Sequence, residues 1–349
     1  MNPAAAQPQP DPALLQVEDL VVEFDTYGGV VKAVRGVSFT VQAGRTLAIV
    51  GESGCGKSVT VQSMMGLIPM PPGRIMGGSA RWRGMEFLAG NLVNGKEIRG
   101  SEIGMIFQDP MTSLNPTMTV GDQIAEPLQV HRGYSYRKAF ARAIELLELS
   151  KIPEAAKRAR QYPFEFSGGM LQRAMIATAI ACKPAILIAD EPTTALDVTI
   201  QAQILDLLQD LQKETGMAII LITHDLGVVA RMADEVAVMY AGKIVERGSV
   251  DDIFYRSAHP YTVGLRAAMP TNDPSRQHRL EPIAGSPPDL FAPPAGCGYT
   301  PRCPHAMQVC DTRHPDSFPI NPGHSACCWL QHDDAPRRPE GLFVREVKS

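Results

Sequence analysis

The chain has 349 residues, of which 44% are hydrophobic and 20% are charged, so it is long and apolar enough to bury a sizeable core. It carries 33 Lys and Arg against 37 Asp and Glu, and the net charge of −4 provides no broad basic field for nucleic acid. No stretch reaches about 18 uninterrupted apolar residues, so no membrane-spanning helix is expected.

The chain begins with a Pro/Ala/Gln-rich stretch and continues with alternating strand and helix patterns. Residues 1–13 have no basic region before an apolar run, and we interpret them as a disordered leader. Three continuously apolar runs suit a largely parallel sheet that is covered on both faces: TLAIVG at 46–51, AILIAD at 185–190 and AIILIT at 218–223. Amphipathic helices are predicted at 135–149 and, with Asp197 as N-cap, at 198–215, which gives an α/β fold.

A glycine-rich segment, GESGCGKS at 51–58, follows the first of these strands and precedes a helix. It fits the phosphate-loop pattern G-x-x-x-x-G-K-[ST], in which backbone N–H groups surround phosphate oxygens. Lys57 is expected to reach the β- and γ-phosphates and Ser58 to bind Mg²⁺. A chance glycine-rich turn is the alternative, and the flanking strand and helix disfavour it. The predicted nucleotide-binding residues are Gly51, Ser53, Gly54, Cys55, Gly56, Lys57, Ser58 and Val59.

Two carboxylates end the strand ILIADEP at 186–192. Asp190 is placed to hold Mg²⁺ directly or through a water molecule, and Glu191 to polarise an attacking water. A merely solvent-exposed acidic strand end is the alternative, and the nearby phosphate loop makes it the weaker one.

The segment FSGGMLQR at 166–173 opens a predicted helix, so Ser167, Gly168 and Gly169 are expected to form a second helix-terminal anion site. A simple helix cap is the alternative. The order of phosphate loop, FSGGMLQR, ADEP and TTALD resembles that of the ATP-binding cassette (ABC) ATPases, whose signature motif matches this segment. Met170 departs from the common form of the signature, in which glutamine is usual.

The resemblance implies an ABC nucleotide-binding domain at 14–270, with a RecA-like core, an antiparallel β subdomain and a helical subdomain at about 112–182. It implies that Gln108 contacts Mg²⁺ or water, that Asp197 forms the D-loop and that His224 contacts the γ-phosphate. An aromatic residue should stack on adenine; Phe24 is the first candidate and Tyr27 the second. The signature of one such subunit closes over ATP bound to another, which implies a second ABC ATPase subunit. This subunit is either a copy of this chain or, as we expect, a related but different chain.

Longer segments, including MIFQDPMTSLNPTMTVGDQI, HPYTVGL and the cysteine-rich end, resemble the ATPases of peptide importers, most nearly the D subunits of oligopeptide and dipeptide permeases. This resemblance implies ATP hydrolysis that energises import through two transmembrane permease subunits, at the cytoplasmic face of the inner membrane. An extracytoplasmic peptide-binding protein would deliver the cargo, and no nucleic acid is involved. The alternatives are an importer of another small solute such as nickel, or a soluble ABC ATPase with a zinc-bearing nucleic-acid module.

Five of the seven cysteines lie between residues 297 and 328, in a proline-rich segment without the apolar periodicity of a core. We assign residues 271–335 to a metal-bearing extension and 336–349 to a flexible tail. The spacing of Cys297, Cys303, Cys310 and Cys327 suits Zn²⁺ or an iron–sulfur cluster and leaves the metal open. Disulfides, free thiols, and zinc with His305 or His324 as a ligand are the alternatives. The resemblance implies a [4Fe–4S] cluster, with Cys327 rather than Cys328 as the fourth ligand.

Overall fold

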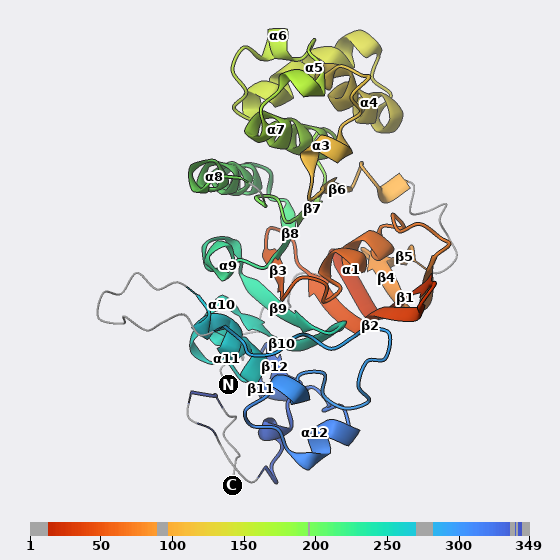
Figure 1. The fold of residues 1–349 in the computed structure, drawn as a ribbon. Helices are drawn as coiled ribbons and strands as arrows, with labels where there is room; N and C mark the ends of the chain where they lie inside the picture. Colours follow the sequence, from red (N-terminus) through yellow and green to blue (C-terminus); the bar gives the residue numbers. More distant parts are fainter. Residues whose placement is uncertain are drawn as a thin grey trace, which may run out of the picture.

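The computed structural model describes residues 13–88, 97–194, 196–269, 282–335, 339 and 341–343. The predicted leader lies outside the described residues except for residue 13, as does most of the predicted tail. Figure 1 shows two sheets, a separate block of helices at the top and the C-terminal segment at the opposite end.

The smaller sheet is antiparallel and has the strand order β2-β1-β4-β5. Its strands are β1 (Leu15–Thr26), β2 (Gly29–Val41), β4 (Gly73–Trp82) and β5 (Met85–Glu86). Val17, Val22 and Phe39 lie on its buried face and pack with Val61 and Met64 of α1 (Lys57–Met64). The sheet therefore lies against the helix that begins inside the phosphate-loop motif.

The larger sheet contains eight strands in the order β11-β12-β10-β9-β3-β8-β7-β6. Its parallel strands are β3 (Thr46–Val50), β6 (Ile103–Ile106), β7 (Ile186–Asp190), β8 (Ala218–Thr223) and β9 (Glu235–Tyr240). Every residue of β3, β7 and β8 is buried, which confirms the three strands predicted from continuous apolar runs. Because these strands are parallel, the loops that carry the predicted phosphate and carboxylate groups leave the same edge of the sheet.

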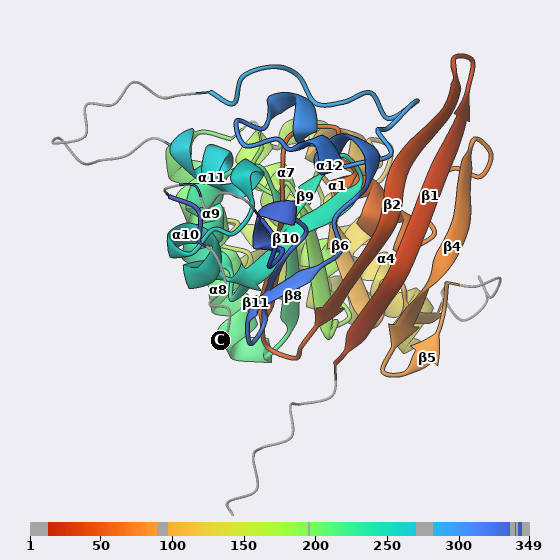
Figure 2. The ribbon, with the colours of Figure 1, turned by 90° about the horizontal axis from the view of Figure 1, so that it is seen from below.

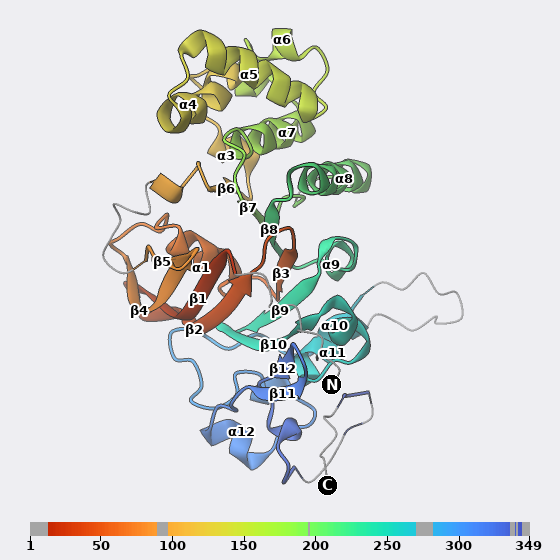
Figure 3. The ribbon, with the colours of Figure 1, turned by 180° about the vertical axis from the view of Figure 1, so that it is seen from behind.

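Helices cover the sheet and form the separate block (Figures 1 and 3). Those on the side away from the smaller sheet are α8 (Val198–Thr215), α9 (Leu226–Met232), α10 (Val250–Tyr255) and α11 (Pro260–Ala267). The block contains α3 (Pro110–Ser113), α4 (Val120–Arg132), α5 (Tyr136–Leu149), α6 (Ala155–Arg158), η1 (Pro163–Glu165) and α7 (Gly168–Ala179). Asp197 accepts a hydrogen bond from Ile200 N, which confirms it as the N-cap of α8. No helix in the described part of the chain is both long and apolar enough to cross a membrane.

The proline-rich C-terminal segment contains only short elements in its described part, as its prolines predict. They are η2 (Thr300–Arg302), α12 (Gln308–Thr312), β11 (Phe318–Asn321), β12 (His324–Ala326) and η3 (Trp329–Gln331). β12 pairs with β10 (Lys243–Ser249), so the segment extends the larger sheet (Figure 2).

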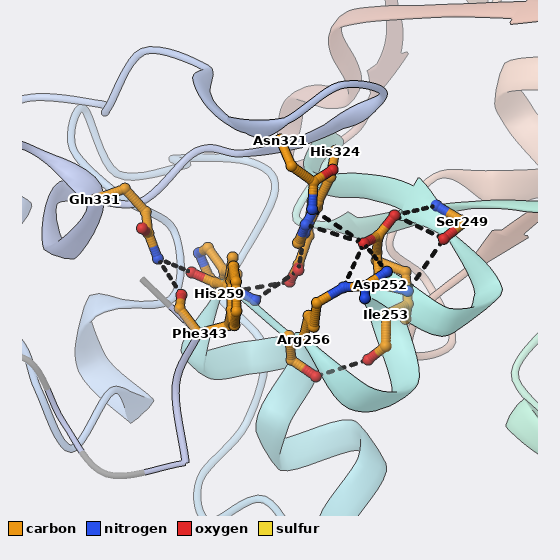
Figure 4. A network of polar contacts seen from close by, with 12 residues as sticks. Ser249, Asp252, Ile253, Arg256, His259, Asn321, His324, Gln331 and Phe343 are labelled. Carbon is orange, nitrogen blue, oxygen red and sulfur yellow. Dashed lines mark hydrogen bonds and ion pairs between the residues drawn. The ribbon is translucent and has the colours of Figure 1, made fainter. Parts of the chain in front are cut away.

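A buried polar network fastens this segment to the rest of the chain (Figure 4). His324 Nε2 lies 2.9 Å from Glu246 Oε1, and both side chains are fully buried. Asn321 Nδ2 donates to Asp252 Oδ1 at 3.2 Å. Gln331 Nε2 donates to the carbonyl oxygens of Ala258 and Phe343, both at 2.8 Å. Since unpaired polar groups are costly in such surroundings, these bonds fix the position of the segment.

Candidate functional site

The phosphate-loop motif links β3 to α1 in a conformation that requires glycine. A Cβ on Gly51 would lie 2.1 Å from Met239 O, and one on Gly56 would lie 2.3 Å from Ala33 O. The backbone carbonyl groups of Met239 and Ala33 therefore pack directly against the loop and leave no room for a side chain at Gly51 or Gly56. Ser53 and Gly54 are exposed at its tip, where a phosphate could approach their N–H groups.

The predicted phosphate-binding lysine is folded over its own loop. Lys57 Nζ donates to the carbonyl oxygens of Gly51 at 2.9 Å and Glu52 at 3.0 Å. The neighbouring Cys55 is buried, and burial raises the pKa of its thiol. A thiol that stays protonated reacts slowly, so Cys55 is a poor nucleophile.

The predicted magnesium ligands from two different elements meet beside the loop. Ser58 Oγ of α1 donates to Asp190 Oδ1 at the end of β7, at 2.8 Å. Gln62 Nε2 lies 3.4 Å from Asp190 Oδ2. Burial raises the pKa of Asp190 and outweighs the opposing effect of the Ser58 hydrogen bond. A hydroxyl and a buried carboxylate side by side are the oxygen donors that Mg²⁺ prefers.

Glu191 follows directly and is the centre of a second cluster. Its carboxylate accepts hydrogen bonds from Gln108 Nε2 at 3.0 Å and Thr194 Oγ1 at 2.9 Å. His224 Nδ1 lies 3.4 Å from Glu191 Oε1. The structure thus brings together Gln108, Glu191 and His224, three residues predicted from separate motifs. Sequence reasoning did not include Thr194; its only signal was its place three residues after Glu191.

The signature segment begins α7 at an exposed surface. Ser167 is the N-cap, and its side chain makes no capping hydrogen bond, so its hydroxyl is available to a ligand from outside. Gly168 is exposed, Gly169 is half-buried, and Met170 packs against the core of the helical block. A Cβ on Gly169 would lie 3.2 Å from Ile200 Cγ2, so the signature lies against the helix that Asp197 caps.

The two aromatic candidates for adenine stacking differ in their surroundings. Phe24 is half-buried, and its ring lies against Gly73 of β4. Tyr27 is fully exposed at the turn between β1 and β2. The assignment of either residue to adenine stays a prediction.

Four cysteines of the C-terminal segment line one small cavity. The cavity is bordered by Cys297, Cys303, Cys310 and Cys328, together with His259, Pro260, Tyr299, Thr300, His305, Trp329 and Leu330. Cys328 borders this cavity, whereas Cys327, the fourth thiol of the sequence interpretation, is not among the residues that line it. The chain is extended at Cys328, with φ −143° and ψ 128°, so adjacent side chains point in opposite directions. Cys327 interacts with Ser317, Lys243 and Cys297.

The cavity is an apolar environment for these thiols. Burial raises the pKa of Cys297 and of Cys328, and it raises that of Cys303 to about 11. Burial also lowers the pKa of His259 to about 3, so the ring is neutral. His259 Nδ1 accepts from Tyr261 N, which leaves the proton on Nε2, and Nε2 has no hydrogen-bond partner. Among the described residues, no three His, Cys, Asp or Glu side chains are grouped to hold one metal ion.

One contact between the cysteine-rich segment and the phosphate loop had no counterpart in the sequence interpretation. Arg302 forms a two-pronged ion pair with Glu52, with N–O distances of 2.6 and 2.9 Å. The two residues are 250 positions apart, so no local pattern indicates the pair.

The fold and the phosphate loop define an ATPase. Two family models match the chain: "ABC transporter" over residues 34–194, and "Oligopeptide/dipeptide transporter, C-terminal region" over residues 245–310. The oligopeptide transport ATP-binding protein OppD of Bacillus subtilis (strain 168) is 56% identical, covering 93% of this chain and 90% of the relative. The dipeptide transport ATP-binding protein DppD of the same organism is 53% identical, covering 92% of this chain and 96% of the relative.

Solved structures agree with this placement. A dimeric ATP-binding cassette in a post-hydrolysis state with ADP and Pi aligns with a TM-score of 0.61 at 26% identity, covering 68% of this chain and 98% of that chain. The chain belongs to the ABC transporter family and is one of its ATP-binding ATPases.

Proposed function

We propose that the chain is the ATP-hydrolysing subunit that energises import of oligopeptides or dipeptides through a membrane ABC transporter. The observation that carries the ATPase part is the convergence of Gln108, Thr194 and His224 on Glu191, next to the Ser58–Asp190 pair. The peptide cargo is supported by the names of the relatives and by the match of residues 245–310 to the oligopeptide/dipeptide transporter region.

The proposed chemistry combines positioning with electrostatic stabilisation. Loop amides and Lys57 hold the β- and γ-phosphates, while Ser58, Asp190 and Gln108 surround Mg²⁺. Glu191 orients the attacking water, and His224 contacts the γ-phosphate. Lys57 Nζ donates to the carbonyl oxygens of Gly51 and Glu52, and binding of the phosphates would exchange these acceptors for phosphate oxygens.

The proposed assembly contains a second, related ABC ATPase, two transmembrane permease subunits and, through them, an extracytoplasmic peptide-binding protein. The exposed Ser167 hydroxyl and the start of α7 would close over ATP held by the partner ATPase. This arrangement places the chain at the cytoplasmic face of the inner membrane. Purification from native membranes should recover the permease subunits with it, and recovery of nucleic acid in their place would contradict the proposal.

The ATPase assignment is tested by Glu191→Gln, which keeps the shape of the side chain but removes its charge. We expect ATP turnover by the assembled transporter to fall by at least about a hundredfold while ATP binding is retained, because the water loses its orienting carboxylate. Lys57→Ala is the comparison variant and should lose binding as well. Full turnover in the Glu191→Gln transporter would remove Glu191 from its proposed role.

We further infer that the extension at 271–335, which follows the nucleotide-binding domain at 14–270 and its helical subdomain at about 112–182, holds a [4Fe–4S] cluster. The donors fit such a group, because four thiols border one cavity and His259 Nε2–H is a buried donor without an acceptor there. A cluster is larger than an ion, so its ligands need not converge on one point as those of zinc must. Bound there, it would supply a covalent crosslink to a segment without its own core.

A further inference from the structure

The guanidinium of Arg302 is one of the most completely bonded groups in the described part of the chain. Its side chain is only 3% exposed. All five of its N–H groups have an acceptor: Nε has Ala284 O, Nη1 has Glu52 Oε2 and Tyr240 OH, and Nη2 has Glu52 Oε1 and Ile283 O. A planar fork with this many fixed partners has one orientation, so it can also fix the carboxylate it binds.

The partner carboxylate belongs to the phosphate loop itself. Glu52 lies between Gly51 and Ser53, and three of its groups are held. Its N–H donates to Tyr261 OH at 2.9 Å, its carbonyl oxygen accepts from Lys57 Nζ at 3.0 Å, and its carboxylate is bound by Arg302. Two of these three restraints come from residues C-terminal to position 260. Tyr261 and Arg302, which lie far from the loop in the sequence, therefore restrain the start of the loop.

The charge of Glu52 makes this restraint relevant to nucleotide binding. A triphosphate bound at the loop is strongly anionic, and an unpaired carboxylate one residue from Ser53 would repel it. Two like charges several ångströms apart near a protein surface cost on the order of 1–2 kcal/mol, or about tenfold in affinity. The bidentate contact with Arg302 neutralises this charge and holds the carboxylate on the guanidinium.

We propose that Arg302 is a positioning residue of the ATP site, supplied by the cysteine-rich segment, which binds the Glu52 carboxylate and neutralises its charge beside the phosphates. This inference rests on the proposed function of the loop in binding ATP. It follows that the nucleotide site is incomplete without the C-terminal segment, although none of that segment's residues belongs to a nucleotide motif.

The test measures binding of a fluorescent ATP analogue, and the KM and kcat of ATP hydrolysis, for full-length variants. Arg302→Met should weaken nucleotide binding about tenfold and raise KM more than it lowers kcat, with a larger effect at low salt. Arg313→Met is the matched control, because Arg313 is an exposed arginine of the same segment. An unchanged affinity in folded Arg302→Met would overturn the proposal.

Removal of the carboxylate separates this role from general loss of structure. Glu52→Gln should bind the nucleotide at least as tightly as the unaltered chain, because no negative charge remains beside the phosphates. The double variant Glu52→Gln/Arg302→Met should recover most of the affinity lost in Arg302→Met. A double variant as weak as Arg302→Met, or a Glu52→Gln variant weakened to the same degree, contradicts the proposal.

The proposed function and the inference fail in different ways. If the unaltered chain binds no ATP, or if Lys57→Ala binds as well as it does, the phosphate loop is not the ATP site. If the unaltered chain binds ATP, Lys57→Ala does not, and Arg302→Met equals its control, then only the inference is wrong.

Discussion

At the scale of single residues, the site depends on groups that are positioned by unusual backbone geometry. Glu191 has a φ of +47°, in the left-handed region that non-glycine residues seldom occupy. Its N–H donates to Ile222 O of β8 at 2.9 Å, which ties the residue to the neighbouring strand. The sharp turn sends Glu191 toward Gln108 and His224, while Asp190 remains beside Ser58. Adjacent carboxylates can thus serve the metal and the water separately.

The adjacent cysteines 327 and 328 provide a prediction at the same scale. Cys328→Ser should lower the iron and acid-labile sulfide of anaerobically purified protein, because it removes one of the four thiols on the cavity. Cys327→Ser is the control and should retain both, because Cys327 is not among the residues that line the cavity. The opposite pattern would restore Cys327 as the fourth ligand, and zinc without sulfide in the unaltered protein would exclude the cluster.

At the scale of elements, the junction of β10, α10 and β11 joins the C-terminal segment to the larger sheet. Asp252 is at its centre: Ser249 caps α10 through a reciprocal pair of hydrogen bonds with it, and Asn321 of β11 donates to it. Burial alone would raise the pKa of Asp252, but hydrogen bonds from Ser249, Asn321 and Arg256 outweigh it and lower the pKa to about 2. The ionised carboxylate is therefore the form that holds the junction.

The lowered pKa predicts acid sensitivity at this junction. The unfolded chain has the ordinary pKa of 3.8, so it takes up a proton before the folded chain does. The contribution of Asp252 to the free energy of unfolding is thus complete above pH 3.8 and is lost as the pH falls toward about 2. Denaturant unfolding across this range should show a shallower loss of stability in Asp252→Asn. An identical pH profile in both proteins would contradict the assignment.

At the scale of the whole molecule, the C-terminal segment completes a core that belongs to the nucleotide-binding part of the chain. Tyr299 is buried against Tyr240 of β9 and Tyr261 of α11, with ring centroids 5.3 and 5.4 Å away. The same cluster includes Val50 at the end of β3, directly before the phosphate loop. The cysteine cavity, which Tyr299 borders, and the phosphate loop, which Val50 precedes, therefore adjoin the same hydrophobic cluster. Arg302 connects the two through its ion pair with Glu52.

Because this core is shared, a destabilising substitution in the C-terminal segment should lower the free energy of unfolding of the whole chain. Tyr299→Ala should lower the free energy of unfolding by about 3–5 kcal/mol, because it leaves a large cavity among aromatic rings. Tyr255→Ala, at a tyrosine that is 79% exposed, should change it by less than about 0.5 kcal/mol. Chemical denaturation of the full chain measures both. Equal effects of the two substitutions would show that the segment packs independently.

Local patterns predicted much of the fold and of the nucleotide site. Strands buried on both faces are apolar throughout, as β3, β7 and β8 are, and the phosphate loop needs a fixed order of glycine, lysine and serine between a strand and a helix. The N-cap of α8 was also predictable from the local pattern, because Asp197 accepts its hydrogen bond from Ile200, three positions further along the chain. Two partners of Glu191, Gln108 and His224, came from separate motifs, whose order in the chain resembles that of the family.

The apolar strands, the phosphate loop and the cysteine cluster can be read from the order of amino acids alone, because each depends on residues that are near one another in the chain. Folding was needed to show that Cys328 and not Cys327 borders the cavity, since the direction of a side chain depends on the backbone around it. It also decided that Arg302 binds Glu52 across 250 positions, since a contact between distant residues is set by the packing of the elements that carry them.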